Sequence, residues 1–265
     1  QALADLGKHE EAIIQYDKVL AIDPNYRFAL YNKGLALDKL GKYDEAIIQF
    51  DKVLAIHPNY KSALKHKGVA LGYLGKYDEA IIQFDKALAI EPKDLYALHN
   101  KGVALDDLGK HEEAIIQYDK ALAIEPKDLH TLYNKGKALY FLDKYEDAIE
   151  WFDKALAIEP KGTLTLTCKG LALHFLDKSE EAIIQFDKAL EIDPNYTLAL
   201  HSKGLALDNL GKHEESIIQY DRVLAIDAKD TFASHSKGLA LHNLGKHEEA
   251  IIQFDKALEI DPNYT

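Results

Sequence analysis

Apolar residues recur along this chain at the spacing of an amphipathic helix, and the whole pattern restarts at positions 27, 61, 95 and so on. In one such period, Leu30, Gly34 and Leu37 lie on one face of a first helix. Ala46 and Phe50 then lie on one face of a second helix. Neither helix can bury its apolar face alone, so the pattern predicts that each helix packs against neighbours on both sides.

Proline and glycine mark the ends of the helices on the same grid. A proline follows every second helix except one, where Ala228 stands instead. A glycine, which tolerates left-handed backbone, ends the first helices, and Asp143 and Asp177 take that place twice. These columns are Pro24, Pro58, Pro92, Pro126, Pro160, Pro194 and Pro262, and Gly7, Gly41, Gly75, Gly109, Gly211 and Gly245. A fixed period of this length indicates an array of repeated units rather than a globule with one centre.

Small and large residues stand in register on the two helices of each unit. The connections are short, so the two helices are predicted to run antiparallel. A glycine column on the first helix should then let the facing helix approach, and an aromatic column on the second helix should fill the core. The columns are Gly34, Gly68, Gly102, Gly136, Gly170, Gly204 and Gly238, and Tyr16, Phe50, Phe84, Tyr118, Phe152, Phe186, Tyr220 and Phe254.

Composition and charge narrow the classes of partner. Hydrophobic residues make up 47% of the chain, which argues against disorder. The 44 acidic and 32 basic residues give a net charge of −12, whereas nucleic-acid binders normally carry a basic stripe. No apolar run is long enough to cross a bilayer, and the lone Cys168 fits a reducing compartment, so we expect a cytoplasmic location. The sequence has no methionine, even at position 1, and we therefore expect a longer gene product.

The order of Gly, Tyr or Phe, Ala and Pro within each period, as in NKGLALDKLGKYDEAIIQFDKVLAIHP, resembles the tetratricopeptide repeat in the form common in microbial arrays. The resemblance covers the whole chain as one array, residues 1–265. It implies an all-α, right-handed superhelical solenoid whose first helices line a concave groove for a peptide or a partner domain. The repeats are a partial one at 1–26 and full ones at 27–60, 61–94, 95–128, 129–162, 163–196, 197–230 and 231–264.

Lysine and aspartate form two further columns, and the lysine stands where the family usually has leucine. One hypothesis is a ladder of Lys–Asp pairs along the array. The other is that duplication copied both columns while each lysine passes over its apolar neighbours. We favour the second, because exposed pairs add only about 0–1 kcal/mol each. The columns are Lys33, Lys67, Lys101, Lys135, Lys169, Lys203 and Lys237, and Asp17, Asp51, Asp85, Asp119, Asp153, Asp187, Asp221 and Asp255.

Motifs for catalysis, cofactors or metals are not found. The Gly-Lys of GKHEEA lacks the preceding glycine of a phosphate loop, and HEEAI has isoleucine where a zinc protease needs its second histidine. We therefore expect no enzyme, no cofactor and no metal. Histidines on first helices match the groove positions of the family, so pH-sensitive binding is a further hypothesis. They are His99, His130, His174, His201, His235 and His242.

The groove positions vary between repeats while the core positions scarcely change. In two repeats the resemblance maps aromatic and apolar residues onto the groove. The flanking repeats are expected to make the groove acidic on either side, with Asp38, Asp106, Asp107 and Asp208. Exposed aromatic clusters often mark interaction sites, and the alternative is that these rings pack against each other and bind nothing in particular. The expected groove residues are His130, Tyr133, Lys137, Tyr140 and Phe141, with Leu164, Thr167, Leu171, His174 and Phe175.

We interpret the chain as a non-enzymatic scaffold for a peptide or protein with an apolar or aromatic anchor and basic flanks. Two alternatives stay open: the recognition region of a larger enzyme or signalling protein, and a self-assembling structural array. Without a polar cap on the last repeat, copies of the chain are also expected to associate through their ends.

Overall fold

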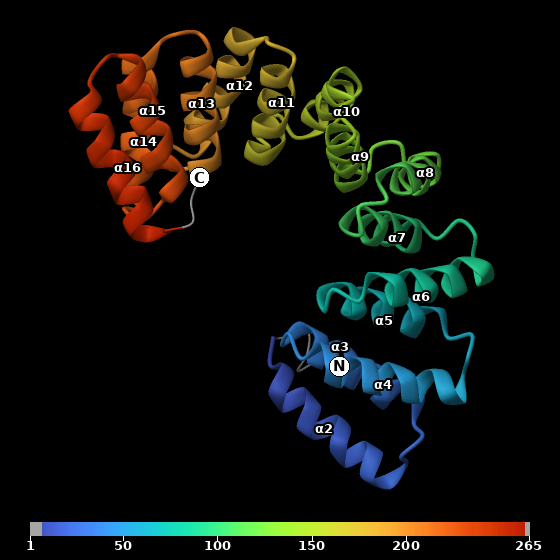
Figure 1. The fold of residues 1–265 in the computed structure, drawn as a ribbon. Coiled ribbons are helices and arrows are strands. Elements are labelled where there is room, and N and C mark those ends of the chain that lie inside the picture. Colours follow the sequence, from blue (N-terminus) through green and yellow to red (C-terminus); the bar gives the residue numbers. More distant parts are fainter. Residues whose placement is uncertain (1–6, 263–265) are drawn as a thin grey trace. The chain divides into compact units, whose positions relative to one another are not determined.

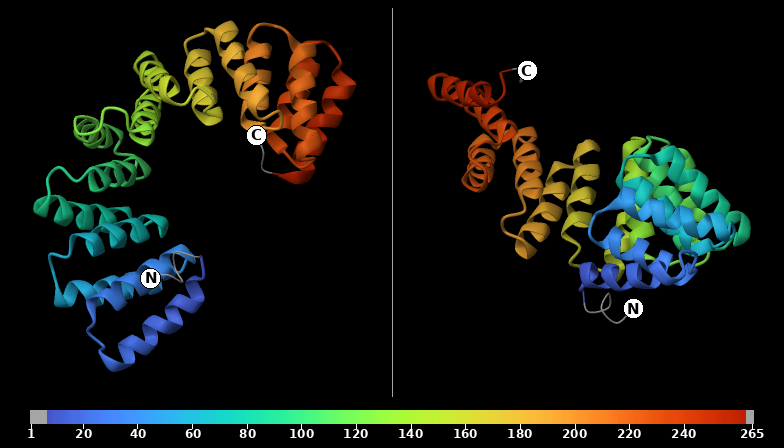
Figure 2. Two further views of the ribbon diagram at one scale, coloured as in Figure 1. Left: turned by 180° about the vertical axis from the view of Figure 1, so that it is seen from behind. Right: turned by 90° about the horizontal axis from the view of Figure 1, so that it is seen from below.

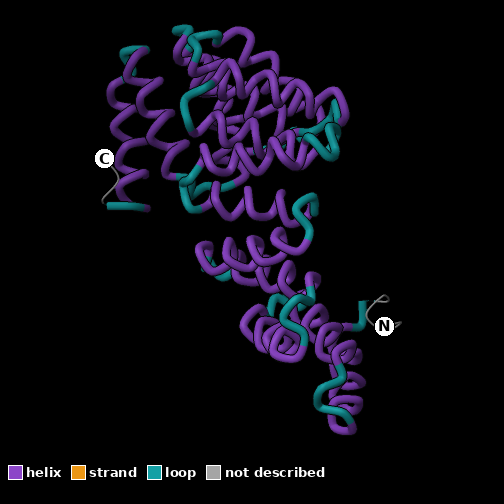
Figure 3. Tube along the Cα trace, turned by 90° about the vertical axis from the view of Figure 1, so that its right-hand side faces the viewer, coloured by secondary structure: helices purple, strands orange, loops and turns teal. Residues whose placement is uncertain are grey.

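The structure is a computed structural model and describes residues 7–262. Helices follow one another in pairs through this range, and no strand occurs in it (Figures 1 and 3). The prediction of an all-α array of helix pairs is confirmed. That all the repeats form a single array stays a prediction. The start of the partial repeat 1–26 lies outside the described residues.

The chain divides into two compact units, Gln1–Asn134 and Lys135–Thr265. The first unit holds α2 (His9–Ile22), α3 (Arg27–Lys39), α4 (Tyr43–Ile56), α5 (Lys61–Tyr73), α6 (Tyr77–Ile90), α7 (Leu95–Asp107) and α8 (His111–Leu122). The second holds α10 (Tyr145–Ile158), α11 (Thr163–Phe175), α12 (Ser179–Ile192), α13 (Thr197–Asn209), α14 (His213–Ile226), α15 (Thr231–Asn243) and α16 (His247–Ile260). The remaining helix, α9 (Leu129–Phe141), begins in the first unit and ends in the second.

Close contact between glycine and an aromatic ring holds the two helices of a repeat together. A Cβ atom built on Gly34 of α3 would lie 2.5 Å from Cε1 of Phe50 in α4. No real side chain tolerates this distance, so glycine is required where the facing ring enters. Phe50 is completely buried as a result, and so are its counterparts Phe152 and Phe186. The predicted pairing of the glycine and aromatic columns is confirmed.

The turns between paired helices follow one hydrogen-bond pattern. The N–H of Gly41 donates to the carbonyl of Asp38, and the N–H of Lys42 donates to that of Leu37, both at 2.9 Å. This arrangement needs left-handed backbone at its fifth residue, which Gly41 supplies with φ 72°. Asp143 adopts the same conformation with φ 57° and Asp177 with φ 58°, as predicted. Aspartate has a conformational cost there that glycine does not.

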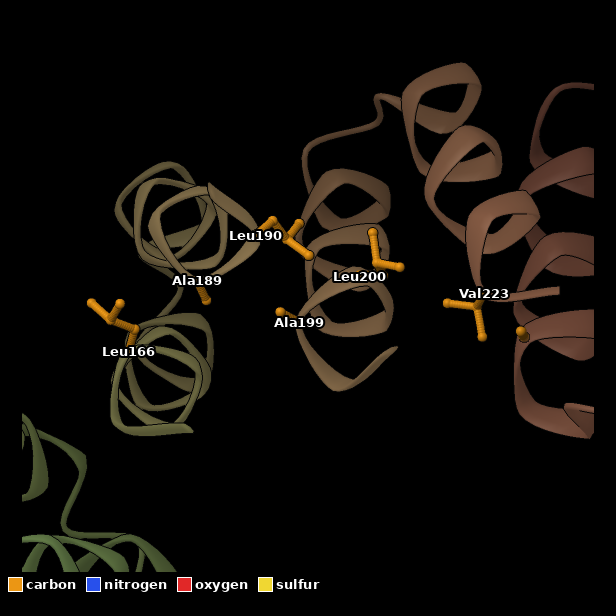
Figure 4. Packing of buried hydrophobic residues seen from close by; sticks show 7 residues of the cluster. Leu166, Ala189, Leu190, Ala199, Leu200 and Val223 are labelled. Carbon is orange, nitrogen blue, oxygen red and sulfur yellow. The ribbon is translucent and has the colours of Figure 1, made fainter. Parts of the chain in front are cut away.

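Neighbouring repeats share a core of leucine, alanine and valine. Leu166 of α11, Leu190 of α12 and Leu200 of α13 pack together with Val223 of α14, and all are buried (Figure 4). In both units, second helices pack against the first helix of the next repeat, as α4 does against α5 and α12 against α13 (Figure 2). Burying a leucine is worth about 1.5–3 kcal/mol. Contacts between repeats therefore contribute a large part of the folding energy.

Lysine and aspartate form the ladder that the sequence analysis did not favour, and that expectation was wrong. Six of the ammonium groups lie against the aspartate of the preceding second helix, because the two helices stack in register. The Nζ–Oδ1 distances are 2.5 Å for Lys33–Asp17, Lys101–Asp85 and Lys169–Asp153, and 2.6 Å for Lys67–Asp51, Lys203–Asp187 and Lys237–Asp221. The aspartates are about half exposed, so each pair adds about 0–1 kcal/mol.

Candidate functional site

First helices form the more crowded side of each unit. In the first unit α3 contacts α5 and α5 contacts α7, and in the second unit α11 contacts α13 and α13 contacts α15. Successive second helices within a unit do not approach one another to the same degree in the described range. The surface of the first helices is therefore where side chains from neighbouring repeats gather.

The expected groove residues divide between the two units. His130 and Tyr133 lie on the part of α9 in the first unit, where exposed His130 borders a cavity of about 340 Å³ with His99 and Asp128. The other residues lie in the second unit, on α9 and α11: Lys137, Tyr140, Phe141, Leu164, Leu171, His174 and Phe175.

One expected groove residue is not accessible. Thr167 is completely buried, and its hydroxyl donates to the carbonyl of Thr163 at 2.9 Å. A small hydroxyl that satisfies its hydrogen bond within its own helix can enter the core at little cost. Its placement in the groove was therefore wrong.

Five rings of the second unit form a cluster, which we call the aromatic cluster: Tyr140, Phe141, Tyr145, His174 and Phe175. Tyr140 lies at its centre, with ring centroids 5.8 Å from Phe141, 5.5 Å from Tyr145 and 5.8 Å from Phe175, all edge to face. Tyr145 stacks on Phe175 at 5.2 Å with the ring planes 10° apart. Such ring pairs are worth about 0.5–1.5 kcal/mol beyond the area they bury, so the cluster holds its shape.

The aromatic cluster is also accessible. Phe141 and Phe175 are each 53% exposed, although phenylalanine usually avoids water. Tyr140 is half-buried, and burial raises the pKa of its hydroxyl. A rigid group of rings, two of which are about half exposed, is suited to receive an apolar or aromatic side chain from another molecule.

Tyr145 belongs to the aromatic cluster, and sequence analysis missed it. Its hydroxyl donates to Oδ1 of Asp143 at 2.6 Å, and this bond raises the pKa of Tyr145 to about 12. Asp143 thereby fixes the ring that stacks on Phe175. The signal was available in the register of the repeats, because Tyr43 and Tyr73 stand at the equivalent positions and stack in the same way at 4.8 Å.

Two of the carboxylates expected to make the groove acidic bond to side chains of their own repeats. Asp106 is buried and its Oδ1 lies 2.6 Å from Nδ1 of His111. Asp208 accepts hydrogen bonds from the hydroxyls of Ser216 and Tyr220 at 2.6 and 2.8 Å. A donor on the following second helix faces each carboxylate. Asp106 is buried as a result, so its assignment to the groove surface was wrong, whereas Asp208 stays partly exposed.

Asp177 supplies an exposed carboxylate instead. It borders an open hollow of about 330 Å³ together with His174, Phe175, Leu205 and Asn209. Asp143 and Asp177 both occupy the left-handed turn position, and both belong to the two repeats that carry the aromatic cluster. Negative charge therefore lies beside the rings, although it comes from the turns rather than from the helices.

His66 and His201 are half-buried, uncharged histidines of first helices. Burial lowers the pKa of His201 to about 4, and its ring meets that of Phe232 edge-on at 4.0 Å. Burial and the nearby charge of Lys65 lower the pKa of His66 to about 4. These two residues are therefore part of the packing between repeats. The half-buried ring of His201 therefore gives no support to the hypothesis that this residue lines an open groove.

The described residues contain no group of three or more His, Cys, Asp or Glu that could hold a metal ion. Within the same range, no helix is both long enough and apolar enough to span a membrane.

Models of the tetratricopeptide repeat match residues 1–41, 28–60, 169–196, 186–218 and 233–264. Together with the helix pairs and the glycine–aromatic contacts, these matches decide the family. The chain belongs to the tetratricopeptide repeat family. A model of subunit 3 of the anaphase-promoting complex, cyclosome, matches residues 73–155 of this tetratricopeptide repeat chain.

Solved tetratricopeptide repeat structures resemble the chain. YrrB, described as a TPR protein with an unusual peptide-binding site, is 26% identical, with 68% of this chain and 93% of that chain covered and a TM-score of 0.56. MamA is 27% identical, with 63% and 92% covered and a TM-score of 0.58. A repeat protein from Parabacteroides merdae ATCC 43184 is 16% identical, with 91% and 95% covered and a TM-score of 0.70, and supports the fold alone. No curated protein matches the sequence significantly.

Proposed function

We propose that the chain is a non-catalytic scaffold that binds a peptide or a partner domain on the surface of its first helices. Tetratricopeptide repeats typically serve protein interaction, and the printed description of the similar YrrB includes a peptide-binding site. The observation that carries the proposal is the aromatic cluster, in which Phe141 and Phe175 remain half exposed beside Tyr140. Water contact at these rings is a cost that a bound side chain would remove.

The chemistry of the site favours an apolar or aromatic anchor with lysine or arginine next to it. The rings would receive the anchor, while Asp177 at the neighbouring hollow would attract the basic flank. The residues proposed to contact the partner are His130, Tyr133, Lys137, Tyr140, Phe141, Leu164, Leu171, His174 and Phe175. We place the complex in the cytoplasm, as expected from the composition.

Selection from a random peptide library displayed on phage tests the proposal. The bait is the chain Gln1–Thr265. The selected peptides are then tested against the variant Tyr140→Ala, Phe141→Ala, Phe175→Ala as a second bait. We expect peptides that contain Phe, Tyr or Trp next to Lys or Arg, and we expect the variant to lose them. Peptides without an aromatic or large apolar residue would contradict the proposed chemistry.

A matched control distinguishes binding at the aromatic cluster from non-specific binding to exposed apolar surface. Ile184, Ile218 and Ile252 are 53, 56 and 53% exposed, close to the exposure of Phe141 and Phe175, but they lie on second helices. Changing all three to Ala removes a comparable apolar surface from the other helices of the same unit. We expect this control to retain the selected peptides. Equal loss in both variants would overturn the proposal.

A further inference from the structure

Gly72, in α5, differs from the glycines that the repeat requires. In the same helix, a Cβ atom on Gly68 would lie 2.7 Å from the Phe84 ring, so Gly68 is needed for packing. A Cβ atom on Gly72 would meet nothing within 4 Å, and the backbone there is ordinary helix. Glycine inside a helix costs about 0.5–1 kcal/mol relative to alanine. Neither packing nor backbone conformation accounts for Gly72.

At the position equivalent to Gly72, other repeats carry a side chain that contacts the start of the second helix. Asp106 reaches His111 and Asp208 reaches His213, with Oδ1–Nδ1 distances of 2.6 and 3.0 Å. Tyr140 reaches Tyr145 with ring centroids 5.5 Å apart. At Gly72 no side chain spans this gap, and the result is a cavity.

The cavity, which we call the Gly72 pocket, lies between two successive repeats of the first unit and measures about 170 Å³. One water molecule needs about 10–15 Å³ on this scale, so the pocket has room for a side chain. Its walls are mainly apolar and aromatic, and the Asn100 amide and one carboxylate stand among them. The lining residues that matter here are Val69, Tyr73, Tyr77, Val103, Ala104 and Asp107.

The walls suit one kind of side chain. Apolar contact along Val69, Val103 and Ala104 fits an aliphatic stem, and the negative charge of Asp107 favours a stem that ends in a cation. Tyr73, which is 68% exposed, and Tyr77 add aromatic faces. A planar guanidinium stacks on such faces and pairs with a carboxylate, while an ammonium is held more strongly by water.

We propose that the Gly72 pocket binds an arginine side chain presented by an exposed segment of a partner protein. The proposal stands on the cavity and its walls, and it does not depend on the aromatic cluster of the second unit. The two sites would take different parts of a partner, or different partners. Loss of either one leaves the argument for the other intact.

Titration of the ¹⁵N-labelled full chain with Nα-acetyl-arginine amide tests the proposal by NMR. We expect saturable shifts of the backbone amides of Val69, Tyr73, Val103 and Ala104. Nα-acetyl-citrulline amide has nearly the shape of the arginine probe but no charge. Nα-acetyl-lysine amide has the positive charge but no planar guanidinium group. Both should bind at least tenfold more weakly than the arginine probe. Absence of saturable shifts, or equal binding of citrulline, overturns the proposal.

Two variants locate the binding. Gly72→Tyr copies the residue that fills this place in repeat 129–162, and we expect it to abolish the arginine-dependent shifts. Asp107→Asn removes the charge at an exposed position, and we expect at least tenfold weaker binding of the arginine probe. Asp78→Asn removes an exposed carboxylate from the second helix α6 and should leave the binding unchanged. If Gly72→Tyr does not fold, unchanged binding in Asp107→Asn overturns the proposal by itself.

Discussion

The Gly72 pocket of the first unit and the aromatic cluster of the second unit occupy the same positions of the repeat, yet their chemistry differs. Each lies where the first helix ends and meets the first helix of the next repeat. One place is hollow with a carboxylate in its wall, and the other is filled with rings. The corresponding residues are Gly72 and Tyr140, Tyr73 and Phe141, Tyr77 and Tyr145, and Asp107 and Phe175.

The core beneath both places is the same. Phe84 lies under Gly68 in the first unit, and Phe152 lies under Gly136 in the second, with equally close contacts. Substitutions that leave the core unchanged therefore convert a cavity into an aromatic surface. In this array the columns that carry the fold are separate from the columns that decide what each repeat can bind.

The largest expected effect comes from removing the rings of the second unit. The variant Tyr140→Ala, Phe141→Ala, Phe175→Ala should weaken binding of a library-selected peptide about a thousandfold. Three anchors worth about 2 kcal/mol each, and not fully additive, give about 4 kcal/mol. Fluorescence anisotropy measures the affinity, and circular dichroism checks that helicity is retained. A loss of less than about tenfold would show that the cluster is not the anchor site.

Acid should weaken both units, because each holds half-buried histidines whose pKa values burial lowers. His201 and His66 have pKa values of about 4 in the folded chain, below the ordinary 6.5. As the pH falls below 6.5, the unfolded chain takes up the proton first. The free energy of unfolding should therefore fall between pH 6.5 and about 4, by on the order of 3 kcal/mol for each histidine.

Urea unfolding at several pH values measures this effect. In His201→Gln the pH slope should be smaller than in the natural chain, and His66→Gln should reduce it in the same way. An unchanged slope in both variants would mean that the fold holds neither histidine in the neutral form.

Filling the Gly72 pocket should stabilise the first unit. Gly72→Tyr replaces a helical glycine at a position with open space, and its ring can contact Tyr77 as Tyr140 contacts Tyr145. We expect the free energy of unfolding to rise by about 1 kcal/mol. Gly68→Ala, one turn earlier, should lower it by about 1–3 kcal/mol because the added Cβ meets the Phe84 ring. Destabilisation by Gly72→Tyr would show that the pocket cannot accept a ring.

The smallest expected change concerns the turn beside the aromatic cluster. Asp143→Gly removes the carboxylate that accepts from Tyr145, so the pKa of Tyr145 should fall from about 12 towards 10. Glycine adopts the left-handed conformation without the cost that aspartate has, and this gain offsets the lost hydrogen bond. The free energy of unfolding should therefore scarcely change. Ultraviolet titration of the tyrosines measures the pKa. The matched variant Asp177→Gly gives the same relief and should leave the Tyr145 titration unaltered; a shift in both variants would argue against the assigned bond.

The repeat fold could be predicted from sequence because its constraints act locally and recur. The contact of Gly34 with Phe50 and the left-handed turn at Gly41 each depend on residues within about half a repeat. The same residue types then return at the same positions, which makes each repeat a check on the others. Even the exceptions, Asp143 and Asp177, followed from backbone chemistry.

The binding surface could be predicted only in part, because the direction of a side chain depends on its neighbours in space. Asp106 turns inward since His111 faces it from the next helix, and Thr167 enters the core because its hydroxyl bonds within the helix. The Lys–Asp ladder depends on how two successive repeats stack. Gly72 lies at neither of the two repeat positions that regularly carry glycine, and this was the available sign of a cavity.

The most direct test of the central claim is to map where a library-selected peptide contacts the chain. Cross-saturation NMR on the deuterated, ¹⁵N-labelled chain reports the amides that lie against a bound peptide. We expect signals from residues 137–141 of α9 and residues 164–175 of α11, with the second helices α10 and α12 unaffected. Signals centred on the exposed isoleucines of second helices, such as Ile184, would contradict it.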